Sequence, residues 1–298
     1  MRLNKLSIED KPIFDKYLNL SRRELSVYAF ENIFIWKKLF DIGWVLIQEN
    51  LCVFFRDKIG CFLYLAPLAR EKNSEVIAQT FRIADKFNKN TQVSRIENLG
   101  NEDLEFYKSL GYECREKSCD YLCHRDDLAA LRGDKFKSKR ASYNYFIKNH
   151  DFQYLPYSSR HKDGCLDLYH LWMHQRMSEN QDAIYQGMLF DSRESFKILL
   201  DNYRKLNYLG RVVKIGKEIR AFTFGYRLND DTFCILFEIT DLSIKGLAQF
   251  IFREFSSELK DYTYINIMDD SGLENLKKVK LSYHPAKLVP AYIAKRGR

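Results

Sequence analysis

The stretch that most constrains the fold runs from Thr232 to Leu259 and reads TFCILFEITDLSIKGLAQFIFREFSSEL. Its first part predicts an apolar strand over Phe233 to Phe237, and a polar turn separates that strand from an amphipathic helix. The helix begins near Lys245 and Gly246 and has an apolar stripe formed by Leu247, Phe250, Ile251 and Phe255. A strand that leads into a glycine-marked helix start leaves backbone N–H groups at the positive end of a helix dipole. The turn is therefore a candidate anion-binding site.

The chain is long enough for two domains. It has 298 residues, of which 46% are hydrophobic and 30% charged, and this composition is that of a globular protein. Two halves repeat one order of elements: helices, a three-stranded meander, a long helix, a strand, a short helix and a further extended segment. We expect an α/β (α+β) protein with domains over 1–130 and 131–298, each a mixed, mostly antiparallel sheet flanked by helices.

Individual elements follow from the periodicity and the turn residues. The two meanders are expected at 44–48, 52–56 and 61–65, and at 208–215, 218–227 and 232–239. Separate strands are expected at 112–115 and 121–124, and helices at 74–88, 161–177 and 192–206. Between 125 and 150 we expect two helices separated at Gly133.

No secretion signal or membrane span is expected, because the N-terminus lacks an apolar core and charges interrupt the most apolar region, 45–68. The seven cysteines are odd in number and scattered among apolar neighbours. They predict reduced core residues of a cytoplasmic protein.

Positive charge is concentrated in two segments. Residues 132–148 hold six basic residues and one acid, and residues 277–298 hold seven basic residues and no acid, in a chain of net charge +8. These segments indicate a polyanionic partner, such as RNA, an anionic membrane surface bound peripherally, or a phosphate-bearing cofactor. A solvated surface and a loose tail are the alternative.

The order of elements resembles that of the GNAT acyltransferase fold. In members that use acetyl-CoA, the turn before the helix reads Gln/Arg-x-x-Gly-x-Gly/Ala. Here the segment from Ser243 to Ala248, SIKGLA, keeps Gly246 and Ala248 but has serine in the first position.

Longer stretches in the same order resemble one family. They are Asp120–Leu128, Gly133–Lys148, Ala221–Gly225, Phe237–Asp241, Lys245–Phe255 and Tyr264–Pro285. Together they are similar to the soluble branch of the phosphatidylglycerol lysyltransferase C-terminal-domain family, whose members have two GNAT-like halves and resemble Fem-type peptidyltransferases. The resemblance implies transfer of an aminoacyl group from a charged tRNA. Since no membrane span is expected, it leaves open whether a lipid headgroup is the acceptor.

Acyl transfer requires a base for the nucleophile and a donor for the developing oxyanion. Glu238 and Asp241 lie at the carboxyl end of the central strand, and Asp269 and Asp270 follow the next strand. Strands of such a sheet deliver their loops to one rim, so these four carboxylates are candidate catalytic groups. The alternative is that Asp241 caps its turn and that Asp269 and Asp270 cap the next helix.

Further candidates complete the predicted site. Tyr283 suits a general acid or oxyanion donor, although many tyrosines only pack. Lys139, Arg140 and Asn144 are about one helical turn apart and are predicted to grip a phosphate or the tRNA backbone, unless they form a solvated face. The remaining predicted substrate-binding residues are Lys245, Gly246, Ala248, Asn266, Lys277 and Lys280.

No metal site is predicted. His170 and His174 are four residues apart, but no His-Glu-x-x-His pattern or third ligand accompanies them. Nucleotide-binding loops and the Gly-x-Ser-x-Gly elbow are also absent from the sequence.

We therefore expect an acyltransferase that moves an aminoacyl group from aminoacyl-tRNA to an amine or hydroxyl of a lipid headgroup, peptide or small molecule. An acyl-CoA-dependent N-acyltransferase is the first alternative. A non-catalytic module that binds RNA, anionic lipid or protein is the second. Sequence leaves the donor, the acceptor and the oligomeric state open.

Overall fold

The structure, a computed structural model, describes residues 2–297. The chain divides into two compact units. Unit 1 takes the chain up to Asp120, together with Asp269–Glu274 and the segment from Leu288 onward. Unit 2 comprises Tyr121–Met268 and Asn275–Lys287.

Unit 1 has a sheet of strand order β1-β2-β3-β4-β5-β12-β6. Its strands are β1 (Asn4–Lys5), β2 (Asp41–Ile47), β3 (Asn50–Arg56), β4 (Cys61–Leu63), β5 (Ile96–Leu99), β12 (Lys287–Arg296) and the first part of β6 (Tyr112–His124). The β4–β5 pair is parallel, whereas β1–β2, β2–β3, β3–β4 and β5–β12 are antiparallel. Its helices are α1 (Lys11–Leu18), α2 (Phe30–Phe34), α3 (Ser74–Phe87) and α4 (Asn101–Ser109), with 3₁₀ turns at Ile8–Asp10, Ile35–Lys38 and Thr91–Val93.

Helix α3 shows why this unit folds as its sequence predicts. Asn73 caps the helix by accepting hydrogen bonds from the backbone N–H groups of Glu75 and Val76. The apolar stripe of the helix includes Val76 and Phe81, which are buried in a core with residues of β2, β3, β4 and β5. A capped amphipathic helix on a meander is thus the packing unit of this half.

Unit 2 has a sheet of strand order β6-β11-β10-β9-β8-β7. Its strands are the last part of β6, β7 (Gln153–Pro156), β8 (Tyr208–Ile215), β9 (Glu218–Arg227), β10 (Thr232–Thr240) and β11 (Tyr264–Asn266). The β10–β11 pair is parallel and the others are antiparallel. Its helices are α5 (Arg125–Ala130), α6 (Lys137–Asn149), α7 (Lys162–Glu179), α8 (Ala183–Asn202), α9 (Leu247–Glu258) and α10 (Glu274–Leu281), with 3₁₀ turns at Asp134–Phe136 and Ser159–His161.

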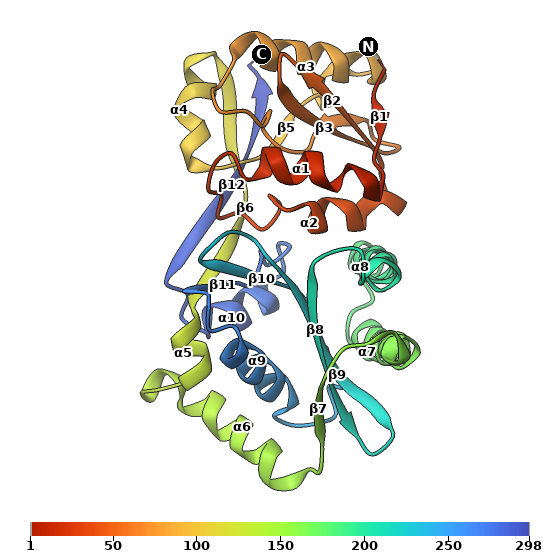
Figure 1. The fold of residues 1–298 in the computed structure, drawn as a ribbon, viewed down its shortest axis with the longest axis vertical. Coiled ribbons are helices and arrows are strands. Elements are labelled where there is room, and N and C mark those ends of the chain that lie inside the picture. Colours follow the sequence, from red (N-terminus) through yellow and green to blue (C-terminus); the bar gives the residue numbers. More distant parts are fainter. Residues whose placement is uncertain (1, 298) are drawn as a thin grey trace. The chain divides into compact units, whose positions relative to one another are not determined.

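Helices cover both faces of the β8–β9–β10 meander (Figure 1). Helices α7 and α8 cover one face, where the rings of Phe196 and Phe222 stack 4.6 Å apart. Helices α6 and α9 cover the other, where Phe146 and Leu247 pack with Ala221. The strand, turn and helix expected from Thr232 to Leu259 are β10 and α9, so this stretch is central to unit 2.

Several elements differ from the sequence-based expectation. The strands expected at 112–115 and 121–124 are one continuous strand, β6, and α8 begins at Ala183 rather than at 192. Residues 288–297 belong to unit 1, although we expected them in the second domain, because β12 pairs with β5. The unit boundary lies at Asp120 instead of residue 130. Among the described residues, no helix is long and apolar enough to cross a membrane.

Candidate functional site

A β-bulge in β10 directs Glu238 toward the face of the sheet that α9 covers. Before the bulge, Phe233 packs with residues of α9. The register against β9 shifts just before Phe237, whose ring lies 5.2 Å from that of Phe196 on α8. Because a bulge inserts one residue into the alternation, Glu238 then faces α9 and lies opposite Thr223 of β9.

The pKa of the Glu238 carboxyl group is well above the usual value for a glutamate. Burial raises its pKa to about 8, and the Thr223 hydroxyl opposes this only in part. Neither Oε2 of Glu238 nor Oγ1 of Thr223 has a hydrogen-bond partner of ordinary geometry among the described residues. Native structures rarely leave buried polar atoms unpaired. Glu238 as a residue is partly exposed, whereas its Oε2 and the Thr223 hydroxyl are buried.

Tyr283 and Lys139 adjoin the same place. Tyr283 is 8% exposed and its ring lies 4.6 Å from that of Phe252 on α9. Burial, and then the negative charge of Glu238, raise the pKa of Tyr283 far above its ordinary value, so its hydroxyl stays protonated and can donate a hydrogen bond. The ammonium of Lys139, on α6, lies 4.1 Å from the centre of the Tyr283 ring. The structure thus brings together three predicted residues from three parts of the chain.

Asp241 is directed elsewhere. Its Oδ2 lies 2.9 Å from Arg220, and its Oδ1 accepts hydrogen bonds from the backbone and hydroxyl of Ser243 and from Gln175 on α7. Burial would raise the pKa of Asp241, but the hydrogen bonds from Ser243 and Gln175 and the charge of Arg220 together lower it. Helix α7 covers the face opposite α9, so Asp241 and Glu238 do not converge. Asp241 holds the turn before α9.

Gly246 has a structural reason to be glycine. Its φ is 85°, and a Cβ there would lie 2.1 Å from the carbonyl oxygen of Ser142 on α6. Lys245 is exposed and its ammonium lies 4.7 Å from the centre of the Tyr145 ring. Ala248 is partly exposed in the first turn of α9. The close approach of α6 explains the glycine without an anion.

The three predicted phosphate-binding residues of α6 face different surroundings. Arg140 donates hydrogen bonds to the carbonyl oxygens of Leu131 and Gly133, and it thereby closes the end of α5. Asn144 is exposed, whereas Lys139 lies over Tyr283. These three side chains therefore do not converge on one phosphate-binding site.

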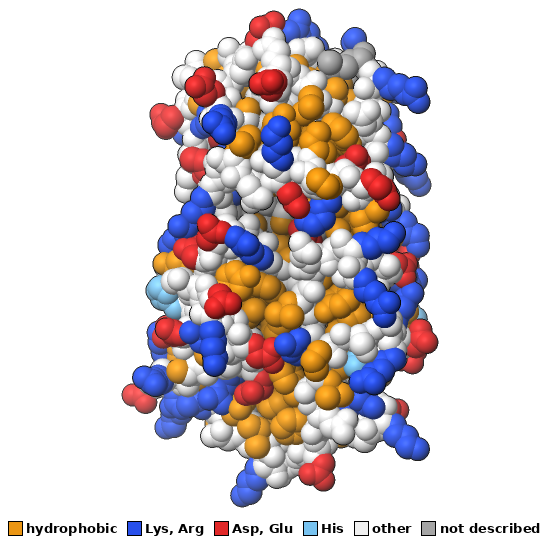
Figure 2. All heavy atoms as spheres, viewed as in Figure 1, with side chains coloured by type: hydrophobic (Ala, Val, Ile, Leu, Met, Phe, Trp, Pro, Cys, Tyr) orange, Lys and Arg blue, Asp and Glu red, His pale blue; other side chains and the backbone are white. Residues whose placement is uncertain are grey.

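The basic segment 132–148 presents its other cations to solvent. Arg132, Lys135, Lys137 and Lys148 are exposed. Lys and Arg side chains lie along the lower left edge of Figure 2, where Figure 1 places α5 and α6, and acidic side chains lie among them. One of these, Asp127, pairs with Lys135 at 2.9 Å. A polyanionic partner for this surface remains a prediction.

Asn266 and Lys280 organise the chain after β11. Asn266 is fully buried and its Oδ1 accepts a hydrogen bond from the backbone of Met268, which has a φ of 60°. Lys280 donates to the carbonyl oxygen of Ile267 at 2.6 Å. Lys277 is exposed on α10. Any substrate contacts of these residues remain predictions.

The other two predicted carboxylates belong to unit 1. Asp270 accepts a hydrogen bond from the backbone of Gly272 at 2.9 Å and so holds the turn before α10. Asp269 lies near Tyr64, whose pKa is raised first by burial and then by the charges of Glu97 and Asp269. The four carboxylates are therefore divided between the units, two in each.

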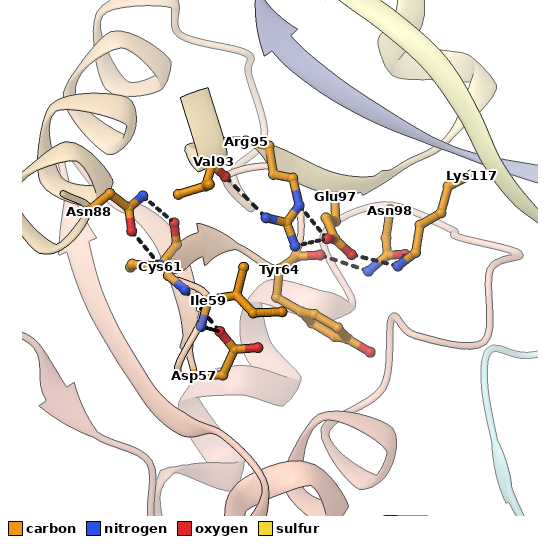
Figure 3. A network of polar contacts seen from close by, with 11 residues as sticks. Asp57, Ile59, Cys61, Tyr64, Asn88, Val93, Arg95, Glu97, Asn98 and Lys117 are labelled. Carbon is orange, nitrogen blue, oxygen red and sulfur yellow. Dashed lines mark hydrogen bonds and ion pairs between the residues drawn. The ribbon is translucent and has the colours of Figure 1, made fainter. Parts of the chain in front are cut away.

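In unit 1, a network of paired polar groups lies around the parallel strands β4 and β5 (Figure 3). Glu97 lies 2.6 Å from both Arg95 and Lys117, and Lys117 also donates to Asn98, whose amide donates to the Tyr64 carbonyl. Burial would raise the pKa of Glu97, but the charges and hydrogen bonds of Lys117 and Arg95 lower it. Glu97 is thus an ionised, paired carboxylate and is unsuited to take up a proton.

Sequence reasoning missed the surroundings of the carboxylates. Thr223, Arg220 and Gln175 were not candidates, because each acts through a partner distant in sequence. His170 and His174 are exposed on α7. Over residues 2–297, no group of three or more His, Cys, Asp or Glu side chains is placed to hold a metal ion.

Comparisons with known proteins agree with this architecture. The family described as "Phosphatidylglycerol lysyltransferase, C-terminal" matches residues 18–295. An uncharacterised protein of Mycoplasmoides gallisepticum is 26% identical over 219 residues, which cover 69% of this chain and 66% of that protein. The chain thus spans just under two thirds of this relative.

Solved structures share the fold over nearly the whole chain. A conserved Bacteroides thetaiotaomicron protein of unknown function is 26% identical, with a TM-score of 0.88 and 99% of each chain covered. L-PGS from Bacillus licheniformis is 16% identical, with a TM-score of 0.65 and coverage of 96% and 92%. FemX is 9% identical, with a TM-score of 0.63 and coverage of 99% and 97%. The expected fold, an α/β protein with two GNAT-like halves, is confirmed.

Proposed function

We propose an acyltransferase function, on the premise that the chain belongs to the phosphatidylglycerol lysyltransferase C-terminal-domain family, whose match covers residues 18–295. The transferred group is an aminoacyl group, the donor is aminoacyl-tRNA, and the acceptor carries an amine or a hydroxyl. The family description and the likeness to L-PGS support this class of reaction. The acceptor-activating group is in unit 2.

The observation that carries this proposal is the carboxyl group of Glu238, whose Oε2 is buried without a hydrogen-bond partner of ordinary geometry among the described residues. A general base is most effective when its pKa lies near the working pH, and burial places that of Glu238 at about 8. Its Oε2 is buried and unpaired among the described residues, so it is free to bind a ligand proton. Glu97, a buried carboxylate on β5 of unit 1, is by contrast paired with Arg95 and Lys117.

The reaction then proceeds as follows. The acceptor nitrogen or oxygen attacks the acyl carbonyl carbon while Glu238 takes the proton of the nucleophile. Tyr283, whose hydroxyl stays protonated, donates a hydrogen bond to the oxyanion that develops. The bond between the carbonyl carbon and the ribose oxygen of the tRNA breaks, and that oxygen leaves with the proton that Glu238 received.

The test compares Glu238→Gln with Glu179→Gln, a substitution of an exposed glutamate at the end of α7. Purified protein is incubated with tRNA charged with a mixture of radiolabelled amino acids and with fractionated cell extract as the source of acceptor. We expect wild type and Glu179→Gln to transfer label to an acceptor fraction, and Glu238→Gln to be slower by about a hundredfold or more.

Three results would contradict the proposal. If Glu238→Gln transferred the aminoacyl group at the wild-type rate, Glu238 could not be the general base. Consumption of acetyl-CoA in a parallel assay, without any use of aminoacyl-tRNA, would indicate an acyl-CoA-dependent enzyme. Binding of tRNA without any transfer would favour a non-catalytic module.

A further inference from the structure

Lys139 is a half-buried cation that has no anionic partner within the described part of the chain. Among residues 2–297, no carboxylate forms an ion pair with its ammonium and no hydrogen bond involves its Nζ. Burial lowers the pKa of Lys139, and no neighbouring negative charge opposes that shift. A cation in this position is stabilised when an anion reaches it.

Nearby cations of the same region are accounted for within the protein. Arg140 donates to the carbonyl oxygens of Leu131 and Gly133. Lys135 pairs with Asp127 at 2.9 Å. Lys137, two residues before Lys139 on α6, is exposed at the surface. Lys139 therefore differs from its neighbours in being neither paired nor fully solvated.

The position of Lys139 is defined by a buried ring. Its ammonium lies 4.1 Å from the centre of the Tyr283 ring, and that ring packs against Phe252 at 4.6 Å. Cation–π attraction orients the ammonium but supplies no counter-charge. Tyr283 in turn lies within the electrostatic influence of Glu238. One aromatic ring thus connects the lone cation with the carboxyl group that we assign as the base.

We propose that Lys139 binds an oxyanion, a carboxylate or a phosphate, carried by the acceptor molecule whose nucleophile reaches Glu238. The identification of the ligand as the acceptor rests on the proposed function, whereas the anion site rests on the surroundings of Lys139 alone. An acceptor that carries both an anion and a nucleophilic amine or hydroxyl would be held at two points, which aligns the nucleophile for attack.

The test measures binding without any donor. Isothermal titration calorimetry is performed with sn-glycerol 3-phosphate and with acetate, and glycerol serves as the uncharged control. The variants are Lys139→Met, which keeps the aliphatic stem over Tyr283, Lys139→Arg, which keeps the charge, and Lys137→Met, which removes an exposed charge from the same helix. Thermal melting of each variant confirms that it is folded.

We expect wild type, Lys137→Met and Lys139→Arg to bind at least one of the two anions and glycerol not to bind. Lys139→Met is expected to lose affinity by about tenfold or more. Binding of glycerol 3-phosphate alone would identify a phosphate-bearing acceptor, and binding of acetate alone a carboxylate-bearing one; both support the site. Equal binding by Lys139→Met and wild type, or no anion binding by wild type, would overturn it.

The two proposals fail separately. If Lys139→Met loses anion binding but wild type transfers no aminoacyl group, the anion site stands and the proposed function does not. If transfer depends on Glu238 while Lys139→Met binds anions normally, the function stands and the anion site does not.

Discussion

Replacing Glu238 by glutamine should make the protein more stable at alkaline pH while it removes the proposed base. The folded state holds the proton of Glu238 with a pKa of about 8, against 4.5 for an ordinary glutamate. At 1.36 kcal/mol for each tenfold step, the folded state binds this proton more tightly by about 5 kcal/mol.

The sign follows from proton counting. Between pH 4.5 and about 8 the folded state carries a proton that the unfolded state lacks, so the free energy of unfolding falls as the pH rises. The contribution is fully present below pH 4.5 and is lost as the pH rises through about 8. From roughly pH 5.5 to roughly pH 8.5 the wild type should lose about 3 kcal/mol through this group, and Glu238→Gln should not.

The assay is urea denaturation of wild type, Glu238→Gln and Glu179→Gln at several values across that range. The difference in free energy of unfolding between Glu238→Gln and wild type should grow with pH, and Glu179→Gln serves as the control for loss of an exposed carboxylate. A difference that does not change with pH would refute the assignment of Glu238 as a buried group of raised pKa. The reasoning about a general base would then lose its physical basis.

Four further substitutions test neighbouring parts of the argument. Gly246→Ala should destabilise the protein by about 2 kcal/mol or more, measured by urea denaturation, because a Cβ would meet the α6 backbone at 2.1 Å and φ is 85°. Tyr283→Phe keeps the buried ring but removes the hydroxyl, so aminoacyl transfer should slow by about tenfold or more with little change in melting temperature. Asp241→Asn weakens a pair with Arg220 and should cost about 1–3 kcal/mol at neutral pH, with the difference from wild type shrinking as the pH falls, because the pKa of Asp241 is lowered. Glu97→Gln leaves two cations without their carboxylate and should destabilise by about 2 kcal/mol at neutral pH, again less at acid pH.

The sequence alone predicted the correct secondary structure where a periodic apolar pattern determines it. The segment from Thr232 to Leu259 forms the expected strand and helix, because its apolar residues recur at the spacing that a buried strand and a one-sided helix require. The middle of β6, by contrast, is polar and exposed, and so it was not recognised as strand. Lys287–Arg296 is a paired strand rather than a loose tail, and its burial shows in Ala291, Ile293 and Ala294 between the basic residues.

The chemistry of the site depended on contacts that no local pattern contains. The sequence identified Glu238, Tyr283 and Lys139 as candidates, and the structure brings them together. The sequence could not show that a bulge turns Glu238 toward α9, because strand alternation gives no sign of an inserted residue. It also could not separate Asp241 from Glu238, since the difference between them lies in distant partners such as Arg220.

Glu97 in unit 1 and Glu238 in unit 2 are carboxylates whose pKa burial would raise, but their surroundings differ in charge. In unit 1, Arg95 and Lys117 neutralise Glu97, so the charge is compensated and the group contributes to stability at neutral pH. In unit 2, no cation forms an ion pair with Glu238 among the described residues, and the Thr223 hydroxyl lowers its pKa only in part, so the folded state must either hold a proton or bear an uncompensated charge. A buried carboxyl group that destabilises the folded protein above neutral pH is retained most readily where it takes up and releases a proton in the reaction. This asymmetry predicts that Glu97→Gln and Glu238→Gln change stability in opposite directions at neutral pH, and that only the second abolishes transfer.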